Sequence, residues 1–146
     1  MSIKRVSGKF DLNVKTKKFR QFKKDIPKVI AENSLNHFLE GFRQNGGKTD
    51  ASKGGWDKRK PTAKRNEGRN ILVDKGALRR DFQVIKAVWG AIVLGTKRIP
   101  YAIRHNEGTT DRLGRKMPQR EFAGESKELN EKNIRLLEKK LNEVMR

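Results

Sequence analysis

The stretch that decides the fold is residues 95–124, GTKRIPYAIRHNEGTTDRLGRKMPQREFAG. Its first half predicts a short helix or turn over residues 101–106, closed by Gly108, because glycine readily ends helices. A loop is expected over residues 109–116, and residues 120–122 are expected to add a third short strand to a small sheet. Although Tyr, His, Glu, Asp and Arg gather here, none has the setting of a catalytic group. Any function of this stretch is therefore expected to come from assembly or binding.

The residues before this stretch predict the rest of that sheet. Apolar and β-branched residues at 82–86 and 88–94 favour two antiparallel strands, joined by a tight turn near residues 86–90. The apolar residues 71–73 are expected to mark the return to ordered structure after a polar segment. Residues 74–80 are predicted to form a turn followed by a short helical or extended segment.

The N-terminal part changes its periodicity near residue 17. Phe10, Leu12 and Val14 alternate with polar residues, which predicts a short amphipathic strand. Apolar residues then recur mostly three or four positions apart, which is typical of a helix with one buried side. These residues are Phe19, Phe22, Ile26, Val29, Ile30, Phe38, Leu39 and Phe42.

Pro27 divides this helical pattern. Because proline fits the first turn of a helix better than its interior, we expect a break or kink near Asp25. A short helix over residues 17–24 would precede a longer one that runs to about Gln44. The Asn-Gly-Gly sequence at residues 45–47 is expected to end that helix through the positive φ that glycine allows.

The C-terminal helix has the clearest pattern, and Glu125 and Glu128 lie near its start, where the helix dipole favours negative charge. Its apolar residues are Leu129, Ile134, Leu137, Leu141, Val144 and Met145. The patterns together predict an α+β fold, in which a small antiparallel sheet packs with a long helix from the N-terminal half and a C-terminal helix. Residues 1–146 are expected to form a single domain, with a flexible basic loop at about residues 45–70.

The composition is strongly basic and poor in apolar residues. Lys and Arg number 36 against 17 acidic residues, a net charge of +19, and only 34% of residues are hydrophobic. The excess lies in residues 1–24, with nine basic and one acidic residue, and in residues 45–80, with eleven and four. Such a charge favours a polyanion or acidic proteins as partners. The sequence predicts neither a signal peptide nor a membrane span.

Catalytic and metal chemistry find little support in the sequence. There is no cysteine, and His37 and His105 are the only histidines. A zinc site takes three or four protein ligands, so no metal or cofactor is expected. His37 is expected to flank the buried side of the first long helix, and His105 to share a helical face with Tyr101. An enzyme is therefore not expected.

Nucleic-acid binding through the basic N-terminal arm and the loop after Trp56 is the alternative that the residues leave open. A basic cluster follows Trp56, an aromatic residue that could stack on a base while the cations contact phosphates. The cluster consists of Lys58, Arg59, Lys60, Lys64 and Arg65. Because no zinc finger, basic zipper or aromatic RNA-binding motif is present, such binding would be neutral to sequence and sensitive to salt.

The order of short motifs is more informative than any one motif. A Trp before the basic loop is followed by ILVDKGAL at residues 71–78, by Gly-Thr at 95–96, by YAIRHNEG at 101–108 and by PQREFAG at 118–124. This order resembles the phage virion morphogenesis family, the tail-completion proteins of Mu-like and related contractile-tailed phages. The residues that carry the resemblance are Trp56, Gly76, Leu78, Gly95, Tyr101, His105, Gly108, Pro118, Arg120, Phe122 and Gly124.

The resemblance implies a non-enzymatic structural protein that completes the tail end and supports head–tail joining. It implies an α+β subunit of a ring, often a hexamer, around the DNA channel, with the tail tube and head-connector proteins as neighbours. The protein would then reside in the virion, after assembly in the host cytoplasm. Trp56 and the basic cluster would form an arm that becomes ordered on assembly. The residues of the 101–124 motifs would shape the subunit core and its interface.

Overall fold

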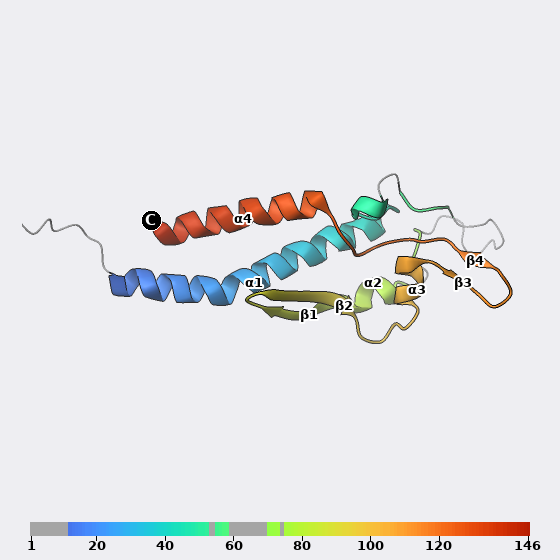
Figure 1. The fold of residues 1–146 in the computed structure, drawn as a ribbon, viewed down its shortest axis with the longest axis horizontal. Helices are drawn as coiled ribbons and strands as arrows, with labels where there is room; N and C mark the ends of the chain where they lie inside the picture. Colours follow the sequence, from blue (N-terminus) through green and yellow to red (C-terminus); the bar gives the residue numbers. More distant parts are fainter. Residues whose placement is uncertain (1–11, 53–54, 59–69, 74) are drawn as a thin grey trace, which may run out of the picture.

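The computed structural model describes residues 12–52, 55–58, 70–73 and 75–146. The fold is α+β, as predicted, with two long helices and a small antiparallel two-stranded sheet (Figure 1). The elements are α1 (Leu12–Arg43), η1 (Asp50–Ser52), α2 (Ala77–Asp81), β1 (Phe82–Val88), β2 (Ala91–Thr96), α3 (Ala102–Glu107), β3 (Thr109–Thr110), β4 (Lys116–Met117) and α4 (Lys127–Met145).

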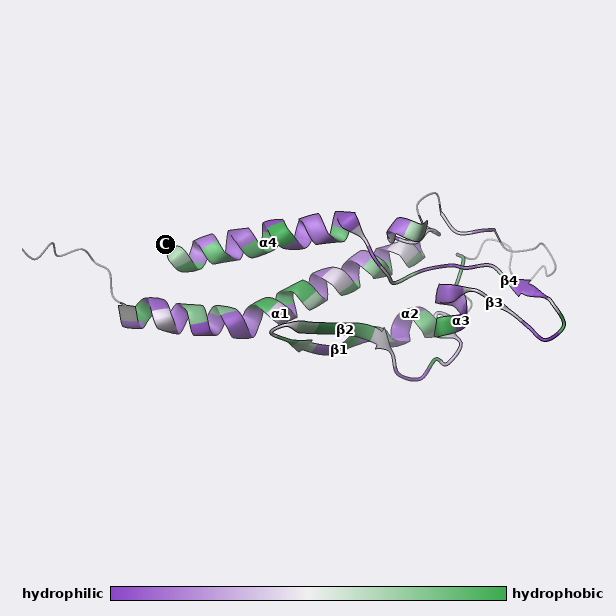
Figure 2. Ribbon diagram, viewed as in Figure 1, coloured by the Kyte–Doolittle hydropathy of each residue, from purple (hydrophilic) through white to green (hydrophobic). Residues whose placement is uncertain are grey.

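Helix α1 lies in the middle of the fold. Figure 1 shows α4 running along one side of it and the β1–β2 hairpin lying on the other. β2 is coloured as hydrophobic over most of its length, whereas β1 and the two long helices mix hydrophobic and hydrophilic residues (Figure 2). The N-terminal turns of α1 extend past the tip of the hairpin, so this part of the helix has fewer neighbours than the rest.

Two predictions for the N-terminal part are wrong. Residues 12–14 are helical rather than extended, and residues 10–11 of the predicted strand lie outside the described residues. A three-residue alternation is too short to specify a strand without a partner, whereas joining an existing helix costs little. The predicted division into two helices near Asp25 is also wrong, because α1 continues through Pro27, so that of the two outcomes predicted there only a kink remains. Its axis nevertheless bends along its length in Figure 1, which is how a helix accommodates an internal proline.

Asn45, rather than a glycine, ends α1. Asn45 has a φ of 54°, and the amide of Gly46 donates to the carbonyl of Gly41 at 3.1 Å, which together form a Schellman cap. The Asn45 side chain also accepts a hydrogen bond from the amide of Ile71, at 2.6 Å. The prediction that glycine supplies the positive φ is therefore wrong, since asparagine also tolerates this conformation and adds a side-chain bond to the next segment.

We predict that Asn45→Ala will lower the free energy of unfolding by about 2 kcal/mol, because it strains the left-handed backbone and removes the partner of the Ile71 amide. Chemical denaturation measures this loss. Asn45→Gly is the control, since glycine adopts the same φ freely and loses only the side-chain hydrogen bonds to Ile71 and Asn70. An equal loss in both variants would show that backbone strain contributes nothing.

The hairpin forms as predicted, but the predicted third strand does not. β1 pairs with β2 from Phe82↔Thr96 to Val88↔Ala91, with one irregularity between Val84 and Lys86. The two-residue turn between these strands falls within the predicted range. Residues 120–122 are not part of either sheet among the described residues; the amides of Arg120 and Phe122 bond instead to α3. A small β3–β4 hairpin occurs in the segment predicted as a loop.

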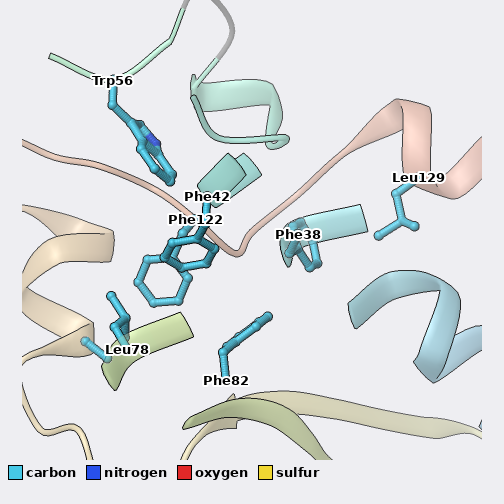
Figure 3. Packing of buried hydrophobic residues seen from close by; sticks show 8 residues of the cluster. Phe38, Phe42, Trp56, Leu78, Phe82, Phe122 and Leu129 are labelled. Atoms are coloured by element: carbon cyan, nitrogen blue, oxygen red, sulfur yellow. The ribbon is translucent and has the colours of Figure 1, made fainter. Parts of the chain in front are cut away.

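The core gathers aromatic side chains from distant segments, as Figure 3 shows. Phe42 contributes from α1 and is fully buried; its ring lies 5.4 Å from that of Phe122 and 5.7 Å from that of Trp56. Phe82 at the start of β1 meets the Phe122 ring edge to face. Leu78 from α2 completes this end of the core. The core therefore connects α1, the hairpin and the 118–124 run.

Helix α4 forms where it was predicted, but only part of its apolar side is buried. Leu129 is in the core, whereas Ile134, Leu141 and Met145 are exposed. Polar contacts add to its packing on α1: Asn33 donates to Asn133 at 2.6 Å, and Lys15 donates to the carbonyl of Met145 at 2.5 Å. Since α4 packs along one helix only, a full apolar side exceeds what this subunit can cover.

Candidate functional site

The 118–124 run is clamped to the segment around Trp56. The indole Nε1 of Trp56 donates to the carbonyl of Glu121 at 3.1 Å, and its ring is only 6% exposed. Arg120 donates through Nε and Nη2 to the carbonyl of Asp57, at 3.2 and 3.1 Å. The interpretation of Trp56 as part of an arm that orders on assembly is therefore wrong. An aromatic ring in a polar segment marks a core anchor here.

Asn106 fixes the other side of the same run and was missed in the sequence. Its Oδ1 accepts from the amides of Phe122 and Ala123 at 3.0 and 3.1 Å, and its Nδ2 donates to the carbonyl of Ala123 at 3.0 Å. The side chain thus replaces a strand partner for this run. The one available signal was an asparagine within the YAIRHNEG motif, immediately before the end of α3.

Tyr101 and His105 share one face of α3, as predicted. Their ring centroids lie 5.6 Å apart with the planes at 87°, and the carbonyl of His105 accepts a bond from the amide of Arg120 at 2.8 Å. Gly108 ends the helix with a φ of 72°, and a Cβ there would lie 3.1 Å from the amide nitrogen of Gln119. These residues therefore build the joint between α3 and the 118–124 run.

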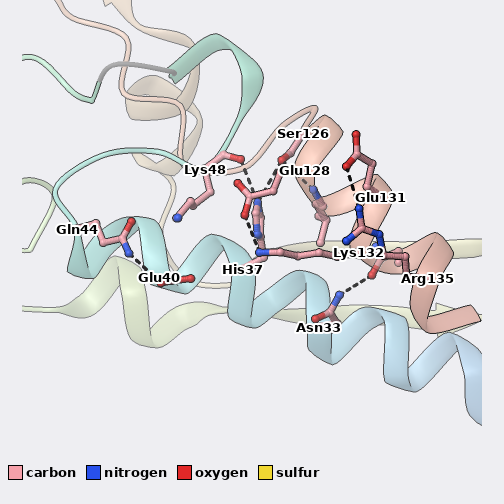
Figure 4. Close-up of polar contacts among 12 residues, drawn as sticks. Asn33, His37, Glu40, Gln44, Lys48, Ser126, Glu128, Glu131, Lys132 and Arg135 are labelled. Atoms are coloured by element: carbon pink, nitrogen blue, oxygen red, sulfur yellow. Dashed lines mark hydrogen bonds and ion pairs between the residues drawn. The ribbon is translucent and has the colours of Figure 1, made fainter. Parts of the chain in front are cut away.

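His37 makes a second joint, between α1, the loop after it and α4 (Figure 4). Its Nε2 lies 3.1 Å from the carbonyl of Lys48 and 3.2 Å from Oγ of Ser126. Because a carbonyl only accepts, Nε2 carries the hydrogen. Ser126 is the N-cap of α4, where its Oγ accepts from the amide of Leu129. His37 is therefore a buried structural residue, consistent with its predicted position beside the core.

The remaining motif residues have separate positions. Gly76 precedes α2, Gly95 lies in β2, Pro118 is half-buried, and Gly124 is exposed before α4. Leu78 is buried in the core. In the basic cluster Lys58 is exposed, while Arg59, Lys60, Lys64 and Arg65 lie outside the described residues. The flexible loop predicted at 45–70 is ordered in part: residues 50–52 form η1, and the amide of Asp50 donates to the carbonyl of Glu125.

A pocket of about 360 Å³ opens between the hairpin and α3, beside the motif residues Gly95 and Phe122. Glu107 is the only side chain with an ionisable group in its lining, and Asn106 is already hydrogen-bonded to the 118–124 run. A single carboxylate among apolar groups offers no acid–base pair. Among the described residues, no group of three or more His, Asp or Glu side chains could hold a metal ion.

Three carboxylates have lowered pKa values, and each forms a surface ion pair. The largest cause is a hydrogen bond from the basic partner, through the backbone amide in the first pair and the side chain in the others. Each pair stabilises the fold at neutral pH, and this contribution is lost as the pH falls through the lowered pKa. The pairs are Asp111–Arg115, Glu128–Lys132 and Glu143–Lys140.

Large apolar side chains remain exposed in several places on the described surface. One group lies on the hairpin and its tip, and another on α3 and the β3–β4 hairpin, in addition to the residues of α4. The first two groups are Ile85, Val88, Trp89, Ile92 and Val93, and Tyr101, Ile103, Leu113 and Met117. Exposed apolar groups in such number are typical of interaction surfaces.

The chain matches no family model, and comparison with curated proteins and with solved structures found no similar protein. Within the described residues, no helix combines the length and hydrophobicity needed to cross a membrane.

Proposed function

We propose that this chain is a structural subunit of a contractile-tailed phage, which completes the tail end and supports head–tail joining as part of a ring. The observation that carries the proposal is the pair of exposed apolar groups, one on the β1–β2 hairpin and one on α3 with the β3–β4 hairpin. A ring built from head-to-tail contacts needs two different surfaces on each subunit. These two groups provide them.

The positions of the motif residues also support the proposal. Trp56, Phe122 and Leu78 are core residues, and Arg120, His105 and Gly108 fix the run that joins α3 to α4. Motifs with these roles are what a shared subunit fold would require. None of the described motif residues forms a catalytic arrangement, so the chemistry favours assembly over turnover.

Ile103 offers the sharpest test of the assembly surface, because it is 66% exposed on α3. We predict that Ile103→Asp will leave the free energy of unfolding within about 0.5 kcal/mol of wild type. The variant should nevertheless fail to cosediment with phage tails that were purified from cells in which this chain is not made. Ile103→Leu is the matched control and should bind tails normally. Cosedimentation of Ile103→Asp at the wild-type level would contradict this assignment of the surface.

Sequence-neutral nucleic-acid binding is the second candidate function. The observation that favours it is a set of exposed cations on α1, most of which have no carboxylate partner on the same helix face. In a protein that surrounds a DNA channel the two functions are compatible. Loss of these cations would lower the affinity for DNA if the chain binds nucleic acid, and would impair particle assembly if the cations serve the ring.

A further inference from the structure

We propose that Lys17, Arg20 and Lys24, the α1 basic stripe, form a binding site for the phosphate backbone of double-stranded DNA. The proposal deepens the proposed function, since it names the part of the subunit that contacts the nucleic acid. It narrows the sequence-based expectation, which placed the contact in the basic N-terminal residues 1–24 and in the loop after Trp56, to one face of α1.

The three cations lie on one face of α1. Spacings of three and four residues place successive side chains on the same side of a helix, and at 1.5 Å per residue the stripe is about 10 Å long. All three side chains are exposed. The helical repeat puts them opposite Phe22 and Ile26, which are buried. The stripe therefore projects from a helix whose other face is anchored in the fold.

The same pattern of residues occurs on α4 with a different electrostatic setting. Lys132, Arg135 and Lys139 repeat the Lys-Arg-Lys order at identical spacing and are also exposed. On α4 the ammonium of Lys132 lies 2.6 Å from the carboxylate of Glu128, and the guanidinium of Arg135 lies 3.8 Å from that of Glu131. Lys139 also acts electrostatically on Glu143, four residues later.

The α1 basic stripe has no such partners. The side chains three and four residues away from its members are neutral or basic. The one nearby carboxylate, Asp25, accepts hydrogen bonds from Gln21 at 2.9 and 3.0 Å. Among the described residues no ion pair involves Lys17, Arg20 or Lys24. Arg20 and Lys24 even repel one another at a four-residue spacing, which destabilises a helix. A polyanion would remove that repulsion.

Duplex phosphates fit this surface better than a single strand does. Single-stranded nucleic acid is held by aromatic side chains that stack on bases, together with cations. The aromatic residue nearest the stripe in sequence, Phe19, lies on the opposite side, where its ring stacks on Phe22 at 5.9 Å. A row of cations without a stacking group contacts a backbone but not bases. The predicted binding is therefore independent of sequence and strongly dependent on salt.

The test uses the full chain, a fluorescent 20-base-pair duplex of mixed sequence, and titrations over a range of salt concentrations. The triple variant Lys17→Gln, Arg20→Gln, Lys24→Gln is compared with Lys132→Gln, Arg135→Gln, Lys139→Gln, which removes the same charge from α4. We expect the α1 variant to bind at least tenfold more weakly at 100 mM salt. Its log–log salt slope should be shallower by about 2.7, since each neutralised phosphate contributes about 0.9. The α4 variant should bind within about threefold of wild type.

Thermal unfolding separates lost binding from lost folding, because removal of like-charge repulsion should leave the α1 variant as stable as wild type or more so. Equal weakening in both variants would overturn the site, since net charge alone would then explain binding. Unchanged binding in the α1 variant, or tighter binding of wild type to a single strand or to polyglutamate, would overturn it too. The assay requires no particle assembly, so its failure is distinguishable from failure of the proposed function.

Discussion

Phe42→Ala is expected to lower the free energy of unfolding by about 3–5 kcal/mol, since a fully buried phenylalanine is replaced by a cavity. The Phe42 ring contacts those of Trp56 and Phe122, so its loss removes the contact that joins α1 to both. This is a large share of the 5–15 kcal/mol that stabilises an ordinary domain. Equilibrium denaturation in urea measures it.

Phe19→Ala is the matched control, because it makes the same substitution on the same helix. Phe19 is 41% exposed and packs on Phe22 at one edge of the structure. We expect it to cost about 1 kcal/mol. If the two variants were equally destabilised, the aromatic cluster around Phe42 would not be the centre of the fold.

Gly47→Ala is expected to cost about 3 kcal/mol, at the upper end of the range for overpacked sites. A Cβ at this position would collide with the side chain of Ser52 and with the carbonyl of Glu121. That carbonyl is held in place by the indole of Trp56, so the collision cannot be relieved by a side-chain rotation. The near-ultraviolet signal of the tryptophans should then be lost at a lower denaturant concentration than in the wild type, and this difference measures the cost.

Gly95→Ala provides the comparison for Gly47→Ala. The nearest atom to a Cβ on Gly95 is Cγ1 of Ile85 at 3.6 Å, which is an ordinary contact. We expect the isolated subunit to unfold within about 0.5 kcal/mol of wild type. A cost at Gly95 equal to that at Gly47 would show that backbone entropy, rather than the collision, dominates both effects.

The elements set by local pattern could be predicted from the sequence. The β1–β2 hairpin follows from two β-branched runs around a short turn, and α4 follows from its apolar repeat. The segment of α3 is predicted as a short helix or turn that closes at Gly108, where the helix does end. The continuation of α1 through Pro27 could not be predicted, because Ile26 and Pro27 are buried in a helix that packs on the hairpin, which local sequence does not show. Packing of that kind overrides local preference.

The contacts that hold residues 118–124 in place could not be predicted from the sequence. The run was predicted to pair as a strand, whereas Asn106, Arg120 and Trp56 hold it by side-chain bonds between segments up to 65 residues apart. The sequence assigns Gly47 only to the end of a helix, yet a Cβ there would collide with the carbonyl oxygen of Glu121 in this run. Contacts between distant segments leave no periodic signal in a sequence.

The candidate sites, too, could be predicted only where they depend on the local sequence. The charge counts correctly placed much of the positive charge in the N-terminal part. Which of those cations lack a carboxylate neighbour could be judged only once α1 was known to begin at Leu12 and to continue without a break. The exposed apolar groups on the two hairpins and α3 could not be predicted, because exposure depends on what the other elements leave uncovered.

Electron microscopy of particles from a phage that encodes this chain, with its gene deleted, tests the central proposal most directly. If the chain completes the tail, the cells will contain DNA-filled heads and separate tails. Supplying the wild-type chain in trans will then restore joined particles. Joined, infectious particles at the wild-type yield in the absence of the chain would contradict the proposed role.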